Sequence, residues 1–159
     1  EARNRLQRLD TLHRFILAIR NSYHDTKPYH DFYHAVDVLQ ATFYILNVLD
    51  IIPGDKSKEG KRLSEAGQRR RTALRRVFRT KDVFALMVAS LGHDVGHPGD
   101  NNFYMINART PLAELYNDQS VLENYHATSL FLLMRKHGLN FYDNDQGPMF
   151  KGKYCCSCF

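Results

Sequence analysis

Apolar residues recur at three- and four-residue steps along much of the chain, which is the spacing of one face of an α-helix. Residues 5–23 carry such a stripe of Leu, Ile and Tyr, with Arg off it, and Pro28 is expected to close this helix. The same pattern predicts helices from about Phe32 to Leu49 and from Ser120 to Gly138, where the glycine suits the position after a helix end.

Residues 83–91 (VFALMVASL) are apolar almost all round and predict a buried helix. Turn-forming residues follow two of these segments, as IIPG at residues 51–54 and as PGDNN at residues 98–102. The chain shows no alternating strand pattern, no repeat and no βαβ rhythm. The sequence therefore predicts an all-α fold.

Composition narrows the class of protein. The 159 residues are 43% hydrophobic and 25% charged, which suits one ordinary core and excludes a disordered, collagenous or multi-domain chain. No apolar run is long enough to span a membrane, and the N-terminus does not resemble a signal peptide, so a cytoplasmic location is expected. All three cysteines (Cys155, Cys156 and Cys158) lie at the C-terminus, which argues against a disulfide framework.

The net charge of +5 is concentrated in one segment. Between Asp55 and Asp82, eleven Lys and Arg face four acids, a local charge of +7 that leaves −2 for the rest of the chain. We interpret this segment as a solvated connection with a helical second half, rather than as a nucleic-acid surface. Its basic runs precede Ser64 and Thr72, a pattern that kinases of the cyclic-AMP-dependent type accept, so a regulatory kinase is a candidate partner.

Five of the eight histidines fall into patterned positions. His30 and His34 are four residues apart, which on a helix places two imidazoles on one face, although by itself that spacing is more commonly explained by a pair of surface histidines. His93 and Asp94 directly follow the most hydrophobic segment, where burial of both groups is costly unless they pair or bind a metal. We therefore predict a metal site there, with His97 close by.

Glu123 and His126 form the third element. Ser120 and Glu123 fit a capping box at a helix start, which by itself explains the glutamate. The three-residue step from Glu123 to His126 also occurs at metal sites in helical bundles, so both residues remain candidates for a supporting role. His13, His24 and His137 have no patterned partner and are interpreted as surface or capping residues.

Taken together, these motifs resemble the class I cyclic nucleotide phosphodiesterases. The segment HDVGHPGDNNFY (residues 93–104) fits that family's signature at every fixed position. Residues 29–38 resemble its upstream motif, and residues 116–118 and 121–124 match the helix that follows the metal loop. The resemblance spans roughly residues 12–140 and implies the N-terminal part of a helical catalytic domain of the HD type, truncated on its C-terminal side.

The resemblance implies hydrolysis of cyclic AMP or cyclic GMP, with cyclic AMP the favoured substrate, at two divalent metals, Zn²⁺ with Mg²⁺ or Mn²⁺. His34, His93 and Asp94 would bind the first metal, and Asp94 would bridge to the second. His30 would be the general acid and Tyr29 would contact substrate. The water molecules on the second metal would be held by His97, Glu123 and His126, while Asn102 would support the loop.

Two departures from the family pattern are visible. Asp31 stands where the family usually has asparagine, which adds negative charge beside His30. The family's fourth metal ligand and its base-binding glutamine come from a later region that this chain does not match. We expect residues 1–145 to be the N-terminal part of the catalytic domain, with 55–82 as its basic connecting segment and 146–159 as an atypical tail, and we expect the chain alone to have little activity.

Three other interpretations remain open at this stage. The segment from His93 to His97 is a near miss to the H-E-x-x-H motif of zinc proteases, with aspartate in place of glutamate. An HD-type phosphohydrolase acting on another nucleotide would share the same ligand types. A helical module that binds nucleic acid or another anionic surface through the basic segment belongs to a different class.

Overall fold

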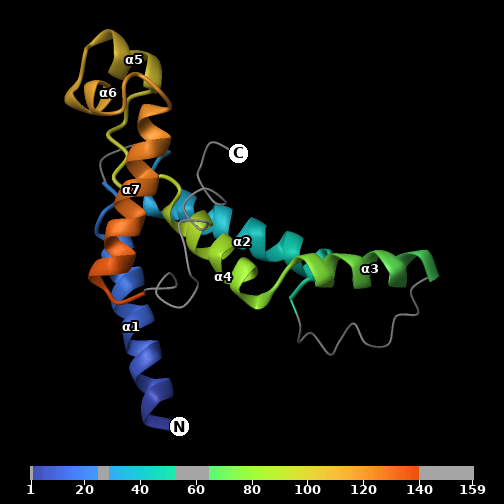
Figure 1. Ribbon diagram of the computed structural model, residues 1–159. Helices are drawn as coiled ribbons and strands as arrows, with labels where there is room; N and C mark the ends of the chain where they lie inside the picture. The colour runs from blue at the N-terminus through green and yellow to red at the C-terminus, as the bar shows by residue number, and fades with distance from the viewer. Residues whose placement is uncertain (1, 25–28, 53–64, 140–159) are drawn as a thin grey trace. The chain divides into compact units, whose positions relative to one another are not determined.

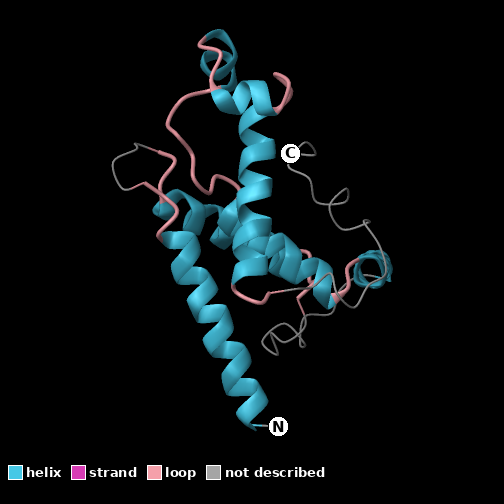
Figure 2. Cartoon of the chain, turned by 60° about the vertical axis from the view of Figure 1, so that its left-hand side comes forward, coloured by secondary structure: helices cyan, strands magenta, loops and turns pink. Residues whose placement is uncertain are grey.

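A computed structural model of the chain describes residues 2–24, 29–52 and 65–139, and these residues form helices and loops with no strand (Figures 1 and 2). The predicted all-α class is therefore confirmed. The helices are α1 (Ala2–Arg20), α2 (Phe32–Val48), α3 (Glu65–Val77), α4 (Thr80–Gly92), α5 (Asn102–Asn107), α6 (Pro111–Leu115) and α7 (Val121–Lys136).

The chain divides into two compact units. The first comprises residues 1–35 and 91–159 and so includes α1, the start of α2, the end of α4, and α5 to α7. The second comprises residues 36–90, which hold the rest of α2, α3 and most of α4. Every candidate site residue belongs to the first unit.

In the first unit, α1 and α7 pack against each other (Figure 1). Their stripes of apolar residues supply fully buried side chains, among them Phe15 and Ile19 of α1 and Val121 of α7. Gly92, the last residue of α4, lies under Leu130 of α7, so closely that an added Cβ would be 2.5 Å from a Leu130 methyl carbon. The absence of a side chain at Gly92 thus lets α7 approach the end of α4.

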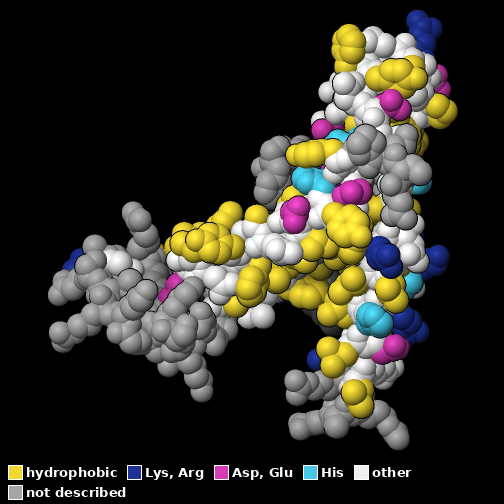
Figure 3. Space-filling model, turned by 180° about the vertical axis from the view of Figure 1, so that it is seen from behind, with side chains coloured by type: hydrophobic (Ala, Val, Ile, Leu, Met, Phe, Trp, Pro, Cys, Tyr) yellow, Lys and Arg dark blue, Asp and Glu magenta, His cyan; other side chains and the backbone are white. Residues whose placement is uncertain are grey.

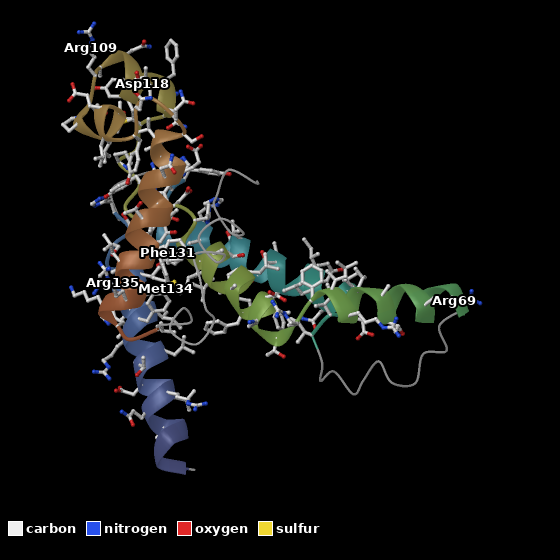
Figure 4. The ribbon with its side chains drawn as sticks, viewed as in Figure 1. Arg69, Arg109, Asp118, Phe131, Met134 and Arg135 are labelled. Atoms are coloured by element: carbon white, nitrogen blue, oxygen red, sulfur yellow. The ribbon has the colours of Figure 1, made fainter. Side chains whose placement is uncertain are left out.

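The short helices α5 and α6 pack at the N-terminal end of α7, over a small core of Met105, Ala113, Val121 and Leu122. Asn101 and Thr110 begin these helices, and each side chain accepts a hydrogen bond from a backbone N–H of the first turn. The connecting turns place Arg109 and Asp118 in the left-handed region, both at this end of the unit (Figure 4).

The C-terminus of α7 follows its sequence signal. Gly138 has a φ of 72°, its N–H donates to the carbonyl of Arg135, and the N–H of Leu139 donates to the carbonyl of Met134. These two bonds satisfy carbonyls that a helix end leaves open. Met134 is buried while Arg135 points outward (Figure 4).

The second unit buries less of its apolar surface. Leu46, Ile51 and Val88 are buried, and the hydroxyls of Thr42 and Ser90 lie 2.9 Å apart between α2 and α4. Large apolar side chains of α2 remain exposed in this unit, namely Phe43, Tyr44, Ile45 and Val48. Hydrophobic side chains are visible at many places on the surface (Figure 3).

The prediction that residues 83–91 are buried all round is wrong in extent. Val88 and Leu91 are buried, whereas the other side chains of this stretch are half-buried, because the described part of the chain covers α4 incompletely. The first helix ends at Arg20, and Pro28, expected to close it, lies outside the described residues, as does the basic stretch 53–64.

Among the described residues, no helix combines the length and the apolar content needed to cross a bilayer.

Candidate metal centre

The candidate site is centred on Asp94, in the turn that follows α4. The helix ends at Gly92, so His93 and Asp94 come directly after the apolar segment, as predicted. Residues 93–96 form a turn in which Gly96 has a φ of 75°. This geometry excludes the zinc-protease interpretation, because H-E-x-x-H requires both histidines on one helix.

His30 and His34 lie at the start of α2, one before the helix and one in its first turn. The helix begins at Phe32, as the periodicity predicted, so His30 precedes it and does not share a helical face with His34. Asp31 explains the start of the helix, because its side chain accepts a hydrogen bond from the His34 N–H at 2.8 Å. Tyr29, with a φ of 73°, is 70% exposed and its ring lies 4.5 Å from that of His34.

The Asp94 carboxylate is shared by three imidazoles. Its Oδ2 lies 2.7 Å from Nδ1 of His30 and 3.2 Å from Nε2 of His93. Its Oδ1 lies 4.0 Å from Nε2 of His126. Burial alone would raise the pKa of Asp94, but the hydrogen bonds of His93 and His30 outweigh it and hold that pKa well below its usual range. The carboxylate is therefore ionised at neutral pH.

His97 stacks on His30, with the ring centroids 3.8 Å apart and the planes within 2° of parallel. The N–H of Gly99 donates to Nδ1 of His97 at 2.9 Å, which leaves the ring proton on Nε2. Burial and the neighbouring His30 lower the pKa of His97 to about 4. His97 is thus a neutral ring with a fixed tautomer.

His126 is 3% exposed and is fixed in the same way. Its Nδ1 lies 2.9 Å from the Val95 carbonyl, which can only accept, so Nδ1 carries the proton and Nε2 faces Asp94. Burial lowers the pKa of His126, which favours the neutral ring. A histidine whose outer nitrogen donates to a backbone carbonyl is the usual arrangement beside a metal.

The capping-box prediction for Ser120 and Glu123 is wrong. Ser120 has a φ of 42° and its side chain makes no capping hydrogen bond. The side chain of Asn102 takes that role instead: its Oδ1 accepts from the Leu122 N–H at 2.9 Å, and its Nδ2 donates to both carboxylate oxygens of Glu123. Asn102 thus joins the start of α5 to the start of α7.

The donor set fits divalent metals. Two groups bring ligand atoms within 4.8 Å of one another, His34 with His93 and Asp94, and His30 with Asp94 and His97. Imidazole nitrogens and a carboxylate suit zinc and manganese, and the carboxylate suits magnesium as well. Asp94 is common to both groups, which is the arrangement that a bridging ligand requires.

The sequence did not predict the support that the turn after α1 gives to the site. The hydroxyl of Tyr23 donates to the Leu91 carbonyl at 2.9 Å and accepts from the Asp94 N–H at 3.3 Å. The Ser22 carbonyl accepts from the Gly96 N–H at 3.0 Å. Burial raises the pKa of Tyr23, so its hydroxyl keeps its proton. From the sequence, Tyr23 was predicted only to belong to the apolar stripe of the first helix, because no local pattern links it to residues some seventy positions later.

The remaining histidines behave as predicted: His13 and His24 are exposed, and His137 is the residue at the C-cap of α7. The cysteine-containing tail lies outside the described residues.

Comparison with known proteins identifies relatives of this chain. The family model described as 3′5′-cyclic nucleotide phosphodiesterase matches residues 29–151. The chain is 38% identical over 131 residues to the probable 3′,5′-cyclic phosphodiesterase pde-6 of Caenorhabditis elegans, covering 82% of this chain and 14% of that protein. It is 33% identical over 135 residues to 3′,5′-cyclic-AMP phosphodiesterase 4C of Rattus norvegicus, covering 85% of this chain and 21% of that protein.

A solved structure has a similar fold. The phosphodiesterase domain of the rhodopsin phosphodiesterase of Salpingoeca rosetta superposes with a TM-score of 0.60 at 30% identity. The match covers 89% of this chain and 35% of the solved one. The chain therefore spans about a third of that solved domain and about a seventh to a fifth of the two curated relatives.

Proposed function

The chain belongs to the 3′5′-cyclic nucleotide phosphodiesterase family, and from this we propose that it forms part of an enzyme that hydrolyses 3′,5′-cyclic nucleotides to 5′-monophosphates. The observation that carries the proposal is the position of Asp94, whose carboxylate belongs to both groups of potential metal ligands. A phosphodiester carries negative charge, and a site of this composition suits a pair of cations that neutralises it.

His34, His93 and Asp94 would hold the first metal, and Asp94 would extend to the second. Zn²⁺ with Mg²⁺ or Mn²⁺ is the pair that the donor set supports. Bound there, the metals would supply an activated water and would stabilise the charge that develops on the phosphate. His97, Glu123 and His126 would orient water, and Asn102 would hold Glu123 through the two hydrogen bonds described above.

His30 is our candidate for the general acid. Its Nδ1 lies on the Asp94 carboxylate and its ring stacks on His97, so the ring is held in one orientation. This leaves Nε2 as the atom that donates a proton to the departing 3′ oxygen. Tyr29 is exposed beside His30, with the two ring centroids 5.1 Å apart, and is positioned to contact the substrate.

The substrate preference that we propose is cyclic AMP, because one of the relatives is named a 3′,5′-cyclic-AMP phosphodiesterase. The matching domain organisation is residues 1–145 as the N-terminal part of the catalytic domain, 55–82 as a basic connecting segment and 146–159 as a tail. A cytoplasmic location remains a prediction from the sequence.

Turnover in a protein that contains this chain within a complete phosphodiesterase domain tests the proposal. His93→Ala and Asp94→Ala should each abolish hydrolysis of cyclic AMP together with metal retention, because each removes a ligand. His13→Ala is the matched control, since His13 is an exposed histidine of α1, and it should keep full activity. Full activity in either ligand variant would overturn the proposal.

A basophilic kinase is the partner that we propose for the basic segment. Thr72 lies on α3, is exposed, and follows Arg69, which is exposed on the same helix (Figure 4). Ser64, the other candidate acceptor, lies outside the described residues. Incubation with a cyclic-AMP-dependent kinase should place phosphate on Thr72 or Ser64, and Thr11→Ala should leave the labelling unchanged. Labelling that persists in a variant lacking both Ser64 and Thr72 would contradict this partner.

A further inference from the structure

The turn that follows α1 contacts both chain segments that supply the candidate metal ligands, and Tyr23 makes these contacts. Its side chain is 4% exposed. The hydroxyl bonds to Leu91 and Asp94 on one side, and the ring meets the ring of Phe32 edge-on, with centroids 6.0 Å apart. Phe32 is the first residue of α2, between His30 and His34.

The two groups that share the Tyr23 hydroxyl are backbone atoms at a helix end. The Leu91 carbonyl is among the last four of α4, which have no partner within the helix. The Asp94 N–H lies in the following turn. A hydroxyl can donate to one and accept from the other at once, which no apolar side chain of the same shape can do. The Tyr23 hydroxyl therefore fixes how far Asp94 lies beyond the end of α4.

We propose that Tyr23 is a positioning residue of the metal centre, whose hydroxyl holds the Asp94 backbone where the carboxylate is shared between the two groups of ligands. The inference rests on the proposed function, because it assigns Tyr23 to that same site. It goes further in naming a residue of the turn after α1, outside the family signature segment at residues 93–104, on which metal affinity depends.

Two further contacts, one from Ser22 after α1 and one from His126 of α7, hold the rest of the turn. The Ser22 carbonyl accepts from Gly96, and Ser22 donates its own hydroxyl to the Ala18 carbonyl within α1. On the opposite side, the Val95 carbonyl is held by His126. The turn that carries Asp94 is thus fixed between the segment after α1 and helix α7, and the Tyr23 hydroxyl is the group that holds the Asp94 N–H.

The test compares Tyr23→Phe with two control variants of the 159-residue chain. Tyr116→Phe removes a hydroxyl that bonds to Thr128, in the α6–α7 region away from the turn. Ile19→Val trims a fully buried side chain of α1 and destabilises the fold without touching a polar contact of the turn. The readouts are hydrogen exchange of the Asp94 amide without metal, and Co²⁺ affinity followed by visible absorption.

We expect Tyr23→Phe to accelerate exchange of the Asp94 amide and to weaken Co²⁺ binding by about 10- to 100-fold, the usual effect of losing a residue that supports a ligand. Neither control should change Co²⁺ affinity more than about twofold, well below that range. Unchanged exchange and affinity in Tyr23→Phe would overturn the inference, as would an equal loss of affinity in Ile19→Val. A wild-type chain that binds no Co²⁺ would contradict the proposed function as well, so the two failures are distinguishable.

Discussion

At the scale of single residues, the site depends on one carboxylate and on the backbone that presents it. Asp94 keeps its charge although it is partly buried, because His30 and His93 bond to the same oxygen. Asp94 lies in the turn at residues 93–96, and Gly96 permits this turn with a φ of 75°. An added Cβ at Gly96 would lie 2.9 Å from the Tyr125 hydroxyl, so the turn has no room for a side chain.

Gly96→Ala should therefore lower the free energy of unfolding by more than the ~1–2 kcal/mol that a left-handed alanine costs. Gly138→Ala is the matched control, since Gly138 has a φ of 72° but no atom within 4 Å of an added Cβ, and it should show the backbone cost alone. Urea unfolding of both variants measures the difference. Equal losses would show that Tyr125 moves aside freely and that the turn is not tightly packed.

The candidate ligands were predicted from the sequence more completely than the residues that hold them in place. His93 and Asp94 could be predicted as metal ligands because they are adjacent and follow the apolar segment, whereas the grouping of His34 with them was implied by the resemblance to the phosphodiesterase family. The partners that hold them come from far along the chain: Tyr23 reaches Asp94 across 71 positions and Asn102 reaches Glu123 across 21. Such contacts depend on tertiary packing, which a local pattern does not encode.

At the scale of elements, the long helices follow their apolar periodicity, whereas α5 and α6 were not predicted. These helices have six and five residues, too few for a period to show. The start of α7 illustrates the same limit. Ser120 and Glu123 have the spacing of a capping box, but the backbone of Ser120 is in the left-handed region, and the Glu123 carboxylate accepts hydrogen bonds from the Asn102 side chain instead. Tertiary structure thus overrides a local capping signal.

Asn102→Ala and Ser120→Ala separate these two accounts of the α7 start. Loss of Asn102 leaves the Leu122 N–H and the Glu123 carboxylate without this partner, and we expect a loss of about 1–2 kcal/mol in the free energy of unfolding. Ser120→Ala removes a side chain that makes no cap, and should change stability by less than about 0.5 kcal/mol. Urea denaturation of the two variants measures these losses. A larger loss in Ser120→Ala than in Asn102→Ala would show that the capping box forms after all.

At the scale of the whole molecule, the described residues assemble the ligands of the candidate centre within one compact unit, while the chain spans about a third of the solved phosphodiesterase domain that it resembles. The exposed apolar side chains Phe43, Tyr44, Ile45 and Val48 of α2 belong to the other unit, as do the half-buried residues of α4. Metal binding is therefore expected of the chain itself, whereas turnover is expected of a protein that also supplies the rest of the domain.

Metal binding should also stabilise the chain, because a ligand that binds only the folded state raises its stability. Zn²⁺ at 100 times its dissociation constant should raise the free energy of unfolding of the wild-type chain by about 2.7 kcal/mol. His34→Ala should remove most of this gain, and His24→Ala, which replaces an exposed histidine, should keep it. Urea unfolding with and without Zn²⁺ measures the effect, and an equal gain in both variants would place the metal elsewhere.

The central claim is that Asp94 is a shared ligand of two metal ions that catalyse hydrolysis of a cyclic nucleotide. Its most direct test is the rate of cyclic AMP hydrolysis by a protein containing this chain within a complete domain, measured after chelation and again as Zn²⁺ and Mg²⁺ are returned. We predict that chelation abolishes hydrolysis, that the two metals together restore it, and that Asp94→Ala prevents the recovery. Hydrolysis that survives chelation, or recovers in Asp94→Ala, would contradict the account.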